Sequence, residues 1–334
     1  MKHIMMRIAV AISALAGAIA PNAAMANGGA EFFNGKTITY IVATSPGGVY
    51  DTNGRLIAQY MQKYLPGSTI IVQNMPGAGH LIGANYISAS KPDGLIFGTF
   101  NTGLIYQQLI KDPGVRFDLG KMSWIGKATA DPRVIIVSTE SGIENFDQLQ
   151  ALKQPIKFSA PGKGTASMME TTMLVKTLKL PVEIVSGYNG NEDQLAMLRG
   201  ETQGVLGSRS EWQPLVNEGK ARIIAQIGGT QTDVPQLSSL ISDPAGQAVV
   251  KLIGSQSNLT SLTAGPADIA ADQLGALREA YRAATEDPDY RAKAKTLGLP
   301  VAPLIGDDVA RLVQTALSAD AQTVDILKET QANE

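Results

Sequence analysis

The feature that most constrains the fold is a repeated order of strand, glycine-containing turn and amphipathic helix. The β-branched and aromatic run Thr37–Ala43 is followed by the turn 45–48, and then by apolar residues at helical spacing from Leu56 to Tyr64. The same order continues with two strands and an intervening helix, over residues 70–73, 95–100 and 80–89. Crossovers of this kind predict a parallel sheet covered on both faces, with ligands at the carboxyl ends of its strands.

A second run of the same order begins near Val134. Its predicted strands cover residues 134–137, 156–159, 182–185, 203–206 and 222–227, and its helices cover residues 146–153, 166–178 and 192–199. A second glycine-rich loop, Ala160–Thr165, follows one of these strands. Two later helices, over residues 269–285 and 307–328, are expected to pack on the first lobe. The predicted fold class is therefore α/β, in two lobes that each contain a mainly parallel sheet.

The first 26 residues have the features of an export signal. Lys2 and Arg7 precede an apolar run over residues 8–20, and Ala24-Met25-Ala26 supplies the small residues of a cleavage site. The run is too short to span a bilayer comfortably. We expect cleavage after Ala26 and an exported protein that does not insert into the membrane.

The polar, proline-containing stretch 126–132 separates the two α/β runs. The expected division is a signal peptide over residues 1–26, a first lobe from residues 27–126 and 252–334, and a second lobe over residues 127–251. We expect the mature chain to be a monomer.

Composition excludes several classes of function. Removal of the signal leaves 26 basic and 30 acidic side chains, a formal charge of −4. This net negative charge does not favour binding to nucleic acid. The absence of cysteine excludes disulfides, thiolate nucleophiles and cysteine metal sites. His80 is the single histidine of the mature chain, and it follows a glycine without a nucleophile motif, so a structural or surface role is favoured. No cofactor, metal or catalytic residue is expected.

Three motifs in order carry a family resemblance: Pro46–Asp51 with Arg55, Val72–Gly79 with Gly83, and Lys91-Pro92-Asp93-Gly94. Together they resemble the extracytoplasmic solute receptors of tripartite tricarboxylate transporters, the Bug family. The resemblance continues more weakly at residues 159–165, 187–190 and 233–235. It implies a type II, Venus-flytrap periplasmic binding protein, which closes on a small organic carboxylate and delivers it to a membrane permease. Such proteins are receptors and not enzymes.

The resemblance also implies a binding site on both lobes. In the first lobe it implies contacts from Gly47, Gly48, Val49, Tyr50, Asp51, Asn101 and Thr102. In the second lobe it implies contacts from Ser159, Gly164, Thr165, Tyr188 and Asn189. Two amide-rich loops that face each other across a cleft are suited to the two ends of a dicarboxylate.

Departures from the family pattern bear on the ligand. Gly207, Ser208 and Arg209 stand where family members often have an acidic residue, which weakens the case for a ligand with an ammonium group. Arg209 is a candidate partner for a second carboxylate or a solvated surface charge, and Tyr50 either contacts the ligand or covers the cleft rim. The expected ligand is a di- or tricarboxylate or an aromatic acid.

The competing hypothesis is an exported α/β enzyme, either a hydrolase or a nucleotide-dependent oxidoreductase. Its best support is the spacing of Gly77, Gly79 and Gly83 between a strand and a helix. That signal is weak, because no acidic residue ends the next strand, over residues 95–100, to hold a ribose hydroxyl.

Overall fold

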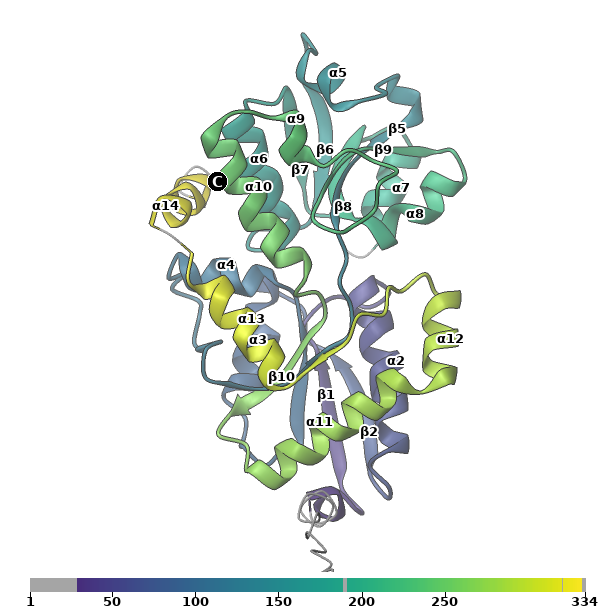
Figure 1. Ribbon diagram of the computed structural model, residues 1–334, viewed down its shortest axis with the longest axis vertical. Helices are drawn as coiled ribbons and strands as arrows, with labels where there is room; N and C mark the ends of the chain where they lie inside the picture. The colour runs from purple at the N-terminus through teal and green to yellow at the C-terminus, as the bar shows by residue number, and fades with distance from the viewer. Residues whose placement is uncertain (1–28, 189–190, 320, 332–334) are drawn as a thin grey trace, which may run out of the picture.

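Two β-sheets, one in each lobe, organise the chain in the computed structural model, which describes residues 29–188, 191–319 and 321–331 (Figure 1). The expected signal peptide and cleavage site lie outside the described residues. So does Asn189, one of the expected ligand contacts. Within the described ranges, no helix has the length and apolar character needed to cross a membrane.

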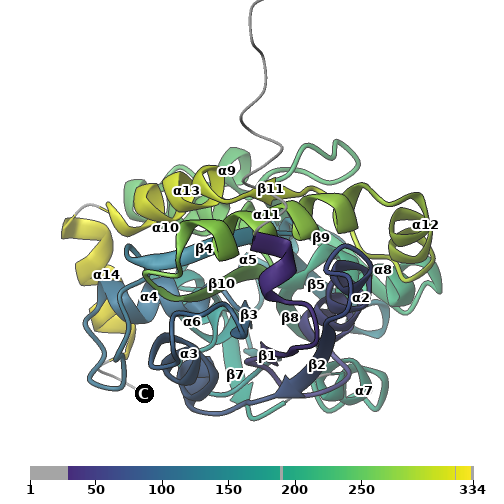
Figure 2. The ribbon, with the colours of Figure 1, turned by 90° about the horizontal axis from the view of Figure 1, so that it is seen from below.

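The first lobe contains a six-stranded sheet. In spatial order its strands are β11 (Leu304–Ile305), β4 (Met122–Lys127), β10 (Leu262–Ala267), β3 (Ile96–Phe100), β1 (Thr37–Val42) and β2 (Thr69–Asn74). One face packs against α2 (Val49–Lys63), α11 (Ala271–Glu286) and α12 (Pro288–Thr296). The other packs against α3 (Leu81–Ser88), α4 (Gly103–Leu109) and α13 (Asp307–Leu317). Figure 2 shows this separation from below, with α3 and α4 on one side and α2 and α12 on the other.

The second lobe contains a five-stranded sheet. Its strands, in spatial order, are β7 (Val182–Ser186), β6 (Ile156–Ala160), β8 (Gly204–Ser208), β5 (Arg133–Ser138) and β9 (Ala221–Ile227). The helices of this lobe are α5 (Phe146–Gln150), α6 (Ala166–Leu178), α7 (Glu192–Leu198), α8 (Arg209–Asn217), α9 (Leu237–Leu240) and α10 (Pro244–Ser257). Apolar side chains from α6 and α10 form the larger core on one face, and Trp212 and Leu215 of α8 pack on the other.

The two-lobed α/β class is confirmed, but the sheets are mixed and not mainly parallel. In the first sheet, β10 pairs antiparallel with both β3 and β4. In the second, β5 pairs antiparallel with both β8 and β9. The two-residue strand β11 also pairs antiparallel with β4. Strands β10 and β5 are those on which the chain has just crossed from one lobe to the other. Such a strand enters its sheet from the cleft side and therefore runs against the βαβ strands beside it.

The end of the chain differs from the expected single helix over residues 307–328. The helix α13 stops at Leu317, and α14 (Ala321–Gln331) packs on α6 and α10, with Leu327 in the core of the second lobe. Helix α10 also runs past the expected boundary at residue 252 to Ser257, and Ile253 is buried in the same core. The expectation that this final segment packs on the first lobe was therefore wrong for α14.

Two crossing segments lie side by side between the lobes, over residues 128–132 and 258–261. The Asp131 amide donates to the Ser257 carbonyl oxygen at 3.1 Å, and the Thr260 hydroxyl donates to the Thr129 carbonyl oxygen at 3.2 Å. These two hydrogen bonds hold the crossing segments together between the lobes.

Candidate functional site

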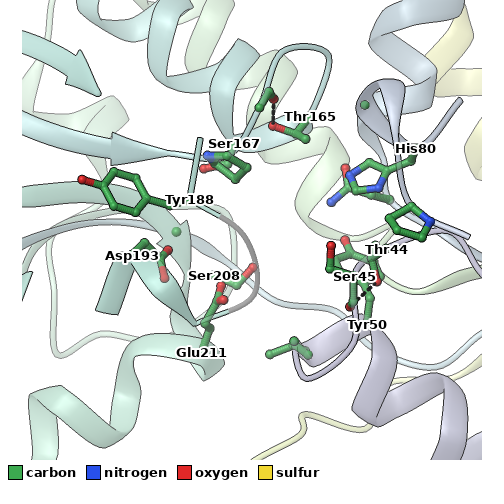
Figure 3. A pocket seen from close by; sticks show the side chains of 18 of the residues that line it. Thr44, Ser45, Tyr50, His80, Thr165, Ser167, Tyr188, Asp193, Ser208 and Glu211 are labelled. Atoms are coloured by element: carbon green, nitrogen blue, oxygen red, sulfur yellow. Dashed lines mark hydrogen bonds between the residues drawn. The ribbon is translucent and has the colours of Figure 1, made fainter. Parts of the chain in front are cut away.

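A cavity of about 430 Å³ lies between the lobes. The first lobe lines it with the loops that follow β1, β2 and β3, and the second lobe lines it with the loop after β6, the end of β8 and the starts of α7 and α8. Figure 3 shows the two walls facing each other, with Thr44, Ser45 and His80 on one side and Asp193, Ser208 and Glu211 on the other. This volume is in the range of small-molecule sites.

The loop after β1 is held by a hydrogen-bonded acidic side chain. Asp51, 5% exposed, accepts from the Gly47 amide at 3.0 Å, from Arg55 at 3.1 Å and from Asn74 at 2.8 Å. Burial opposes its charge, but the hydrogen bonds from Arg55, Gly47 and Asn74 outweigh burial, so the pKa of Asp51 lies below its usual value. The Asp51 carboxylate therefore stabilises the conformation of the loop through these hydrogen bonds.

The start of α2 is open toward the cavity. Gly48 is its N-cap, and no side chain accepts from the first-turn amides there. Those amides and the positive end of the helix favour an anion. Gly48 itself has φ −82° and ψ 174°, which any residue can adopt, whereas Gly47 has φ +90°. Gly47 is therefore required for the turn, and Gly48 leaves space beside the amides.

His80 lines the cavity, although the sequence favoured a structural or surface role for it. Its Nδ1 lies 2.8 Å from the Ala43 carbonyl oxygen, which requires that Nδ1 carry the proton. Burial lowers the pKa of His80, so the imidazole is neutral at pH 7 and Nε2 is an acceptor. The ring extends toward the gap between the lobes (Figure 3).

The second glycine-rich loop leads into α6. The Thr165 hydroxyl caps this helix by accepting from the Met168 amide at 3.4 Å, and the Ser167 hydroxyl donates to the Leu206 carbonyl oxygen at 2.6 Å. Both residues line the cavity. This wall presents hydroxyl groups and has a side-chain cap, unlike the start of α2.

A buried ion pair lies beneath the cavity. Arg133 donates through Nε to Glu170 at 2.6 Å, through Nη1 to the Ser208 hydroxyl at 3.1 Å and through Nη2 to the Leu206 carbonyl oxygen at 3.2 Å. The Tyr106 hydroxyl donates to the other carboxylate oxygen of Glu170 at 3.0 Å. Because Tyr106 belongs to α4 and Glu170 to α6, this network joins the lobes. It also leaves little of the Arg133 charge for a ligand.

Two carboxyl groups line the second-lobe wall without a salt bridge to any described residue: Asp193 and Glu211. Burial, followed by the charge of Asp193, raises the pKa of Glu211 to about 8. Burial also raises the pKa of Asp193 to about 6. Neither residue was predicted, because each comes from the first turn of a separate helix and no local motif marks it.

The lobes touch beside the cavity through two glycines. The Gln107 side-chain amide donates to the carbonyl oxygens of Gly79 at 2.8 Å and of Gly164 at 2.5 Å. A β-carbon added at Gly79 would lie 2.8 Å from the Gly164 Cα, too close for a real contact. Both glycines have positive φ. The contact therefore depends on the absence of side chains at both positions.

The structure brings together six of the expected contact residues in the cavity lining: Gly48, Val49, Tyr50, Asn101, Thr165 and Tyr188. Of these, Tyr188 points its ring away from the first lobe (Figure 3). Thr102 is buried, and the buried Ser159 hydroxyl donates to the Gly204 carbonyl oxygen at 3.4 Å. Arg209 pairs with Asp233 and faces a separate, more open hollow on the other side of α8.

Several cavity residues were not anticipated, namely Thr44, Ser45, His80, Arg133, Ser167, Asp193, Ser208 and Glu211. Thr44 and Ser45 directly precede the expected loop, so the end of β1 contained a usable signal. The described residues include no group of three or more His, Asp or Glu side chains arranged to hold a metal ion.

Comparison with known proteins identifies the family. The model of the tripartite tricarboxylate transporter family receptor, TctC, matches residues 54–329. The chain belongs to this family. It is therefore a receptor and not an enzyme, and the enzyme hypothesis has no support.

Individual relatives are distant but similar over most of their length. A UPF0065 protein from the gbd 5′ region of Cupriavidus necator is 24% identical over 298 residues, which are 87% of this chain and 86% of the relative. The structure of MatC from Rhodopseudomonas palustris with bound malate has a TM-score of 0.70 at 21% identity, over 87% of this chain and 99% of that one. A second R. palustris structure, with adipate, has a TM-score of 0.68 at 15% identity, over 88% and 97%. These likenesses establish the binding-protein fold.

Proposed function

We propose that this protein is a periplasmic receptor that binds a small organic carboxylate between its lobes and presents it to the membrane permease of a tripartite tricarboxylate transporter. The observation that carries the proposal is the uncapped start of α2, which opens into an interlobe cavity of about 430 Å³. The malate and adipate in the two related structures support a carboxylate as the ligand class.

In this proposal the carboxylate accepts from the amides at the start of α2. Gly48, Val49, Tyr50, Asn101 and Thr165 contact the ligand, because they line the cavity. Gly47 and Asp51 act through the shape of the loop. Residues 1–26 are removed as an export signal, and the mature receptor acts as a monomer in the periplasm.

The test is thermal unfolding of the mature protein against mono-, di- and tricarboxylates, aromatic acids, amino acids and nucleotides. A ligand at 100 times its Kd adds about 2.7 kcal/mol to the free energy of unfolding. A rise in the midpoint with nucleotides alone would contradict the proposal.

The Gly48→Val variant tests the position of the site. The backbone at Gly48 accepts valine without strain, and the new side chain occupies space beside the α2 amides. We expect loss of ligand stabilisation with little change in the unfolding of the free protein. Gly275→Val is the matched control, because Gly275 is exposed on α11 with nothing near its added β-carbon. Equal ligand affinity in Gly48→Val and Gly275→Val would show that the start of α2 is not part of the binding site.

A further inference from the structure

A second hollow, of about 700 Å³, lies on the other side of α8 from the interlobe cavity. The first lobe lines it with α12 and residues 297–301, and the second lobe lines it mainly with the first half of α8. Residues 130–132 of a crossing segment also contribute. We call it the α8–α12 hollow. Figures 1 and 2 both show these two helices at the same side of the molecule, one in each lobe. A molecule that filled the hollow would therefore contact both lobes at once.

Helix α12 brings two unpaired cations to the α8–α12 hollow. Arg291 and Lys295 are four residues apart on this helix, and both are exposed and line the hollow. Neither forms a salt bridge with any described residue. The Arg291 Nε donates to the Thr285 carbonyl oxygen at 3.0 Å, which orients the side chain without neutralising its charge. Spacing by one helical turn places the two charges on one face of α12.

The other charged groups of the hollow do not balance these cations. Arg209 pairs with Asp233, and its Nη1 is buried without an acceptor among the described residues. Asp131 is the one carboxylate among the described lining residues, and its two oxygens accept from the amide and the hydroxyl of Ser210. Even with Asp233 counted, the hollow has three cations and two carboxylates, in a chain of net negative charge. A concave surface concentrates the field of such an excess and attracts an anionic partner.

The hollow also presents apolar surface from both lobes. Leu297, at the end of α12, is 51% exposed. Pro214 of α8 is exposed on the opposite side, and Pro132 and Pro300 line the space between them. Because proline fixes the backbone, this surface is preformed and little order is lost on binding. A small inorganic anion would use only the cations, whereas a protein segment with acidic and apolar side chains would use the whole surface.

From this arrangement we infer that the α8–α12 hollow is a docking surface for an acidic, leucine-containing segment of the membrane permease. The carboxylates of that segment pair with Arg291 and Lys295, and its apolar side chains cover Leu297. The inference rests on the proposed function for the identity of the partner. The start of α8 separates the two sites, since Glu211 lines the interlobe cavity and Arg209 lines the hollow. A segment bound in the hollow therefore contacts the helix that forms part of the ligand cavity.

The test uses two short peptides that carry the same uncharged dye, one of glutamate and leucine and the other of glutamine and leucine. Fluorescence anisotropy with the mature protein gives each Kd. Two exposed ion pairs should make the glutamate peptide bind ~tenfold more tightly at low salt. The preference should diminish as salt rises from ~0.02 M to ~0.3 M, because the Debye length shortens.

A matched pair of double variants locates the site. Arg291→Gln combined with Lys295→Gln removes the two unpaired cations of the hollow, and should abolish most of the preference for glutamate. Lys293→Gln combined with Lys251→Gln removes two exposed cations that lie outside the hollow, and should leave the preference unchanged. All four side chains are exposed, so both variants should unfold at the wild-type temperature.

The apolar contact has a test of its own. Leu297→Asn should weaken binding of both peptides, because both contain leucine. Leu198→Asn is the control, since Leu198 is 48% exposed in the second lobe and does not line the hollow. Equal binding by Leu297→Asn and Leu198→Asn would show that Leu297 is not part of a docking surface.

The outcomes separate this inference from the proposed function. Equal affinity of wild-type protein for the two peptides overturns the inference, as does an equal loss of preference in the two double variants. Displacement of the glutamate peptide by inorganic phosphate at the same concentration as by unlabelled peptide would show a small-anion site, and also overturns it. A carboxylate panel with binders but no selective peptide binding refutes only the docking surface. Selective peptide binding without any carboxylate binder refutes the proposed function, and with it the permease as the partner.

Discussion

Replacement of Arg133 by methionine should destabilise the second lobe strongly. The Arg133 side chain is 12% exposed and that of Glu170 is 1% exposed, so the substitution leaves a carboxylate buried with only the Tyr106 hydroxyl as a partner. Removal of one partner of a buried pair costs about 3–5 kcal/mol. Because whole domains are stable by only about 5–15 kcal/mol, the loss should be measurable by urea unfolding.

A matched substitution controls for the loss of an arginine as such. Arg199 also pairs with a glutamate, Glu201, at 2.6 Å in the same lobe, but the two side chains are 55% and 47% exposed. Exposed pairs contribute about 0–1 kcal/mol, so Arg199→Met should change the free energy of unfolding by less than that. An Arg133→Met cost no greater than the Arg199→Met cost would refute the reasoning.

The same pair can be tested by charge removal. Glu170→Leu in the Arg133→Met background removes the stranded carboxylate, and should recover most of the lost stability. The cost of Arg133→Met alone should also be smaller at pH 5 than at pH 8. Without its arginine, Glu170 should have a higher pKa and should be neutral in acid.

Three further results are expected. Gly79→Ala should weaken ligand binding more than it weakens the fold, because its β-carbon would meet Gly164 where the lobes touch; an unchanged Kd by calorimetry would contradict this. Since the pKa of Glu211 is raised to about 8 in the folded protein, its contribution to stability is present below its unfolded pKa and is lost as pH rises through about 8. In Glu211→Gln the urea midpoint should change less between pH 5 and pH 8 than it does in the wild-type protein. An equally steep dependence of the midpoint on pH would contradict this prediction. Asp51→Ala should free the loop and reduce affinity by ~tenfold, which a binding titration would detect; wild-type affinity would show that its hydrogen bonds do not position the site.

The locally encoded parts of the fold were predictable from sequence. Strands β1, β6 and β9 are rich in β-branched or aromatic residues and end near glycine or polar turns, and helix α6 was predicted with its observed bounds. Strand β10 was not predicted. Its partners β3 and β4 lie more than 130 residues away in sequence, and that pairing determines its strand conformation.

The site was predictable where loops that follow strands supply it. Gly48, Val49 and Tyr50 come from the loop after β1, and three further expected residues that line the cavity come from the loops after other strands: Asn101, Thr165 and Tyr188. Asp193 and Glu211 meet there only because two separate helices start at the same wall. Arg209 is close to Ser208 in sequence, but the start of α8 directs it to Asp233 on the far side. Which side of a helix start faces a cleft is determined by packing between elements and not by local sequence.

The central claim is that the interlobe cavity holds one carboxylate ligand. Its most direct test is a calorimetric titration of the mature wild-type protein and of Gly48→Val with the ligand that the thermal panel identifies. We predict saturable binding of one ligand per wild-type chain and no measurable binding to Gly48→Val. Absence of saturable heat with every carboxylate, or an unchanged Kd in Gly48→Val, would contradict the claim.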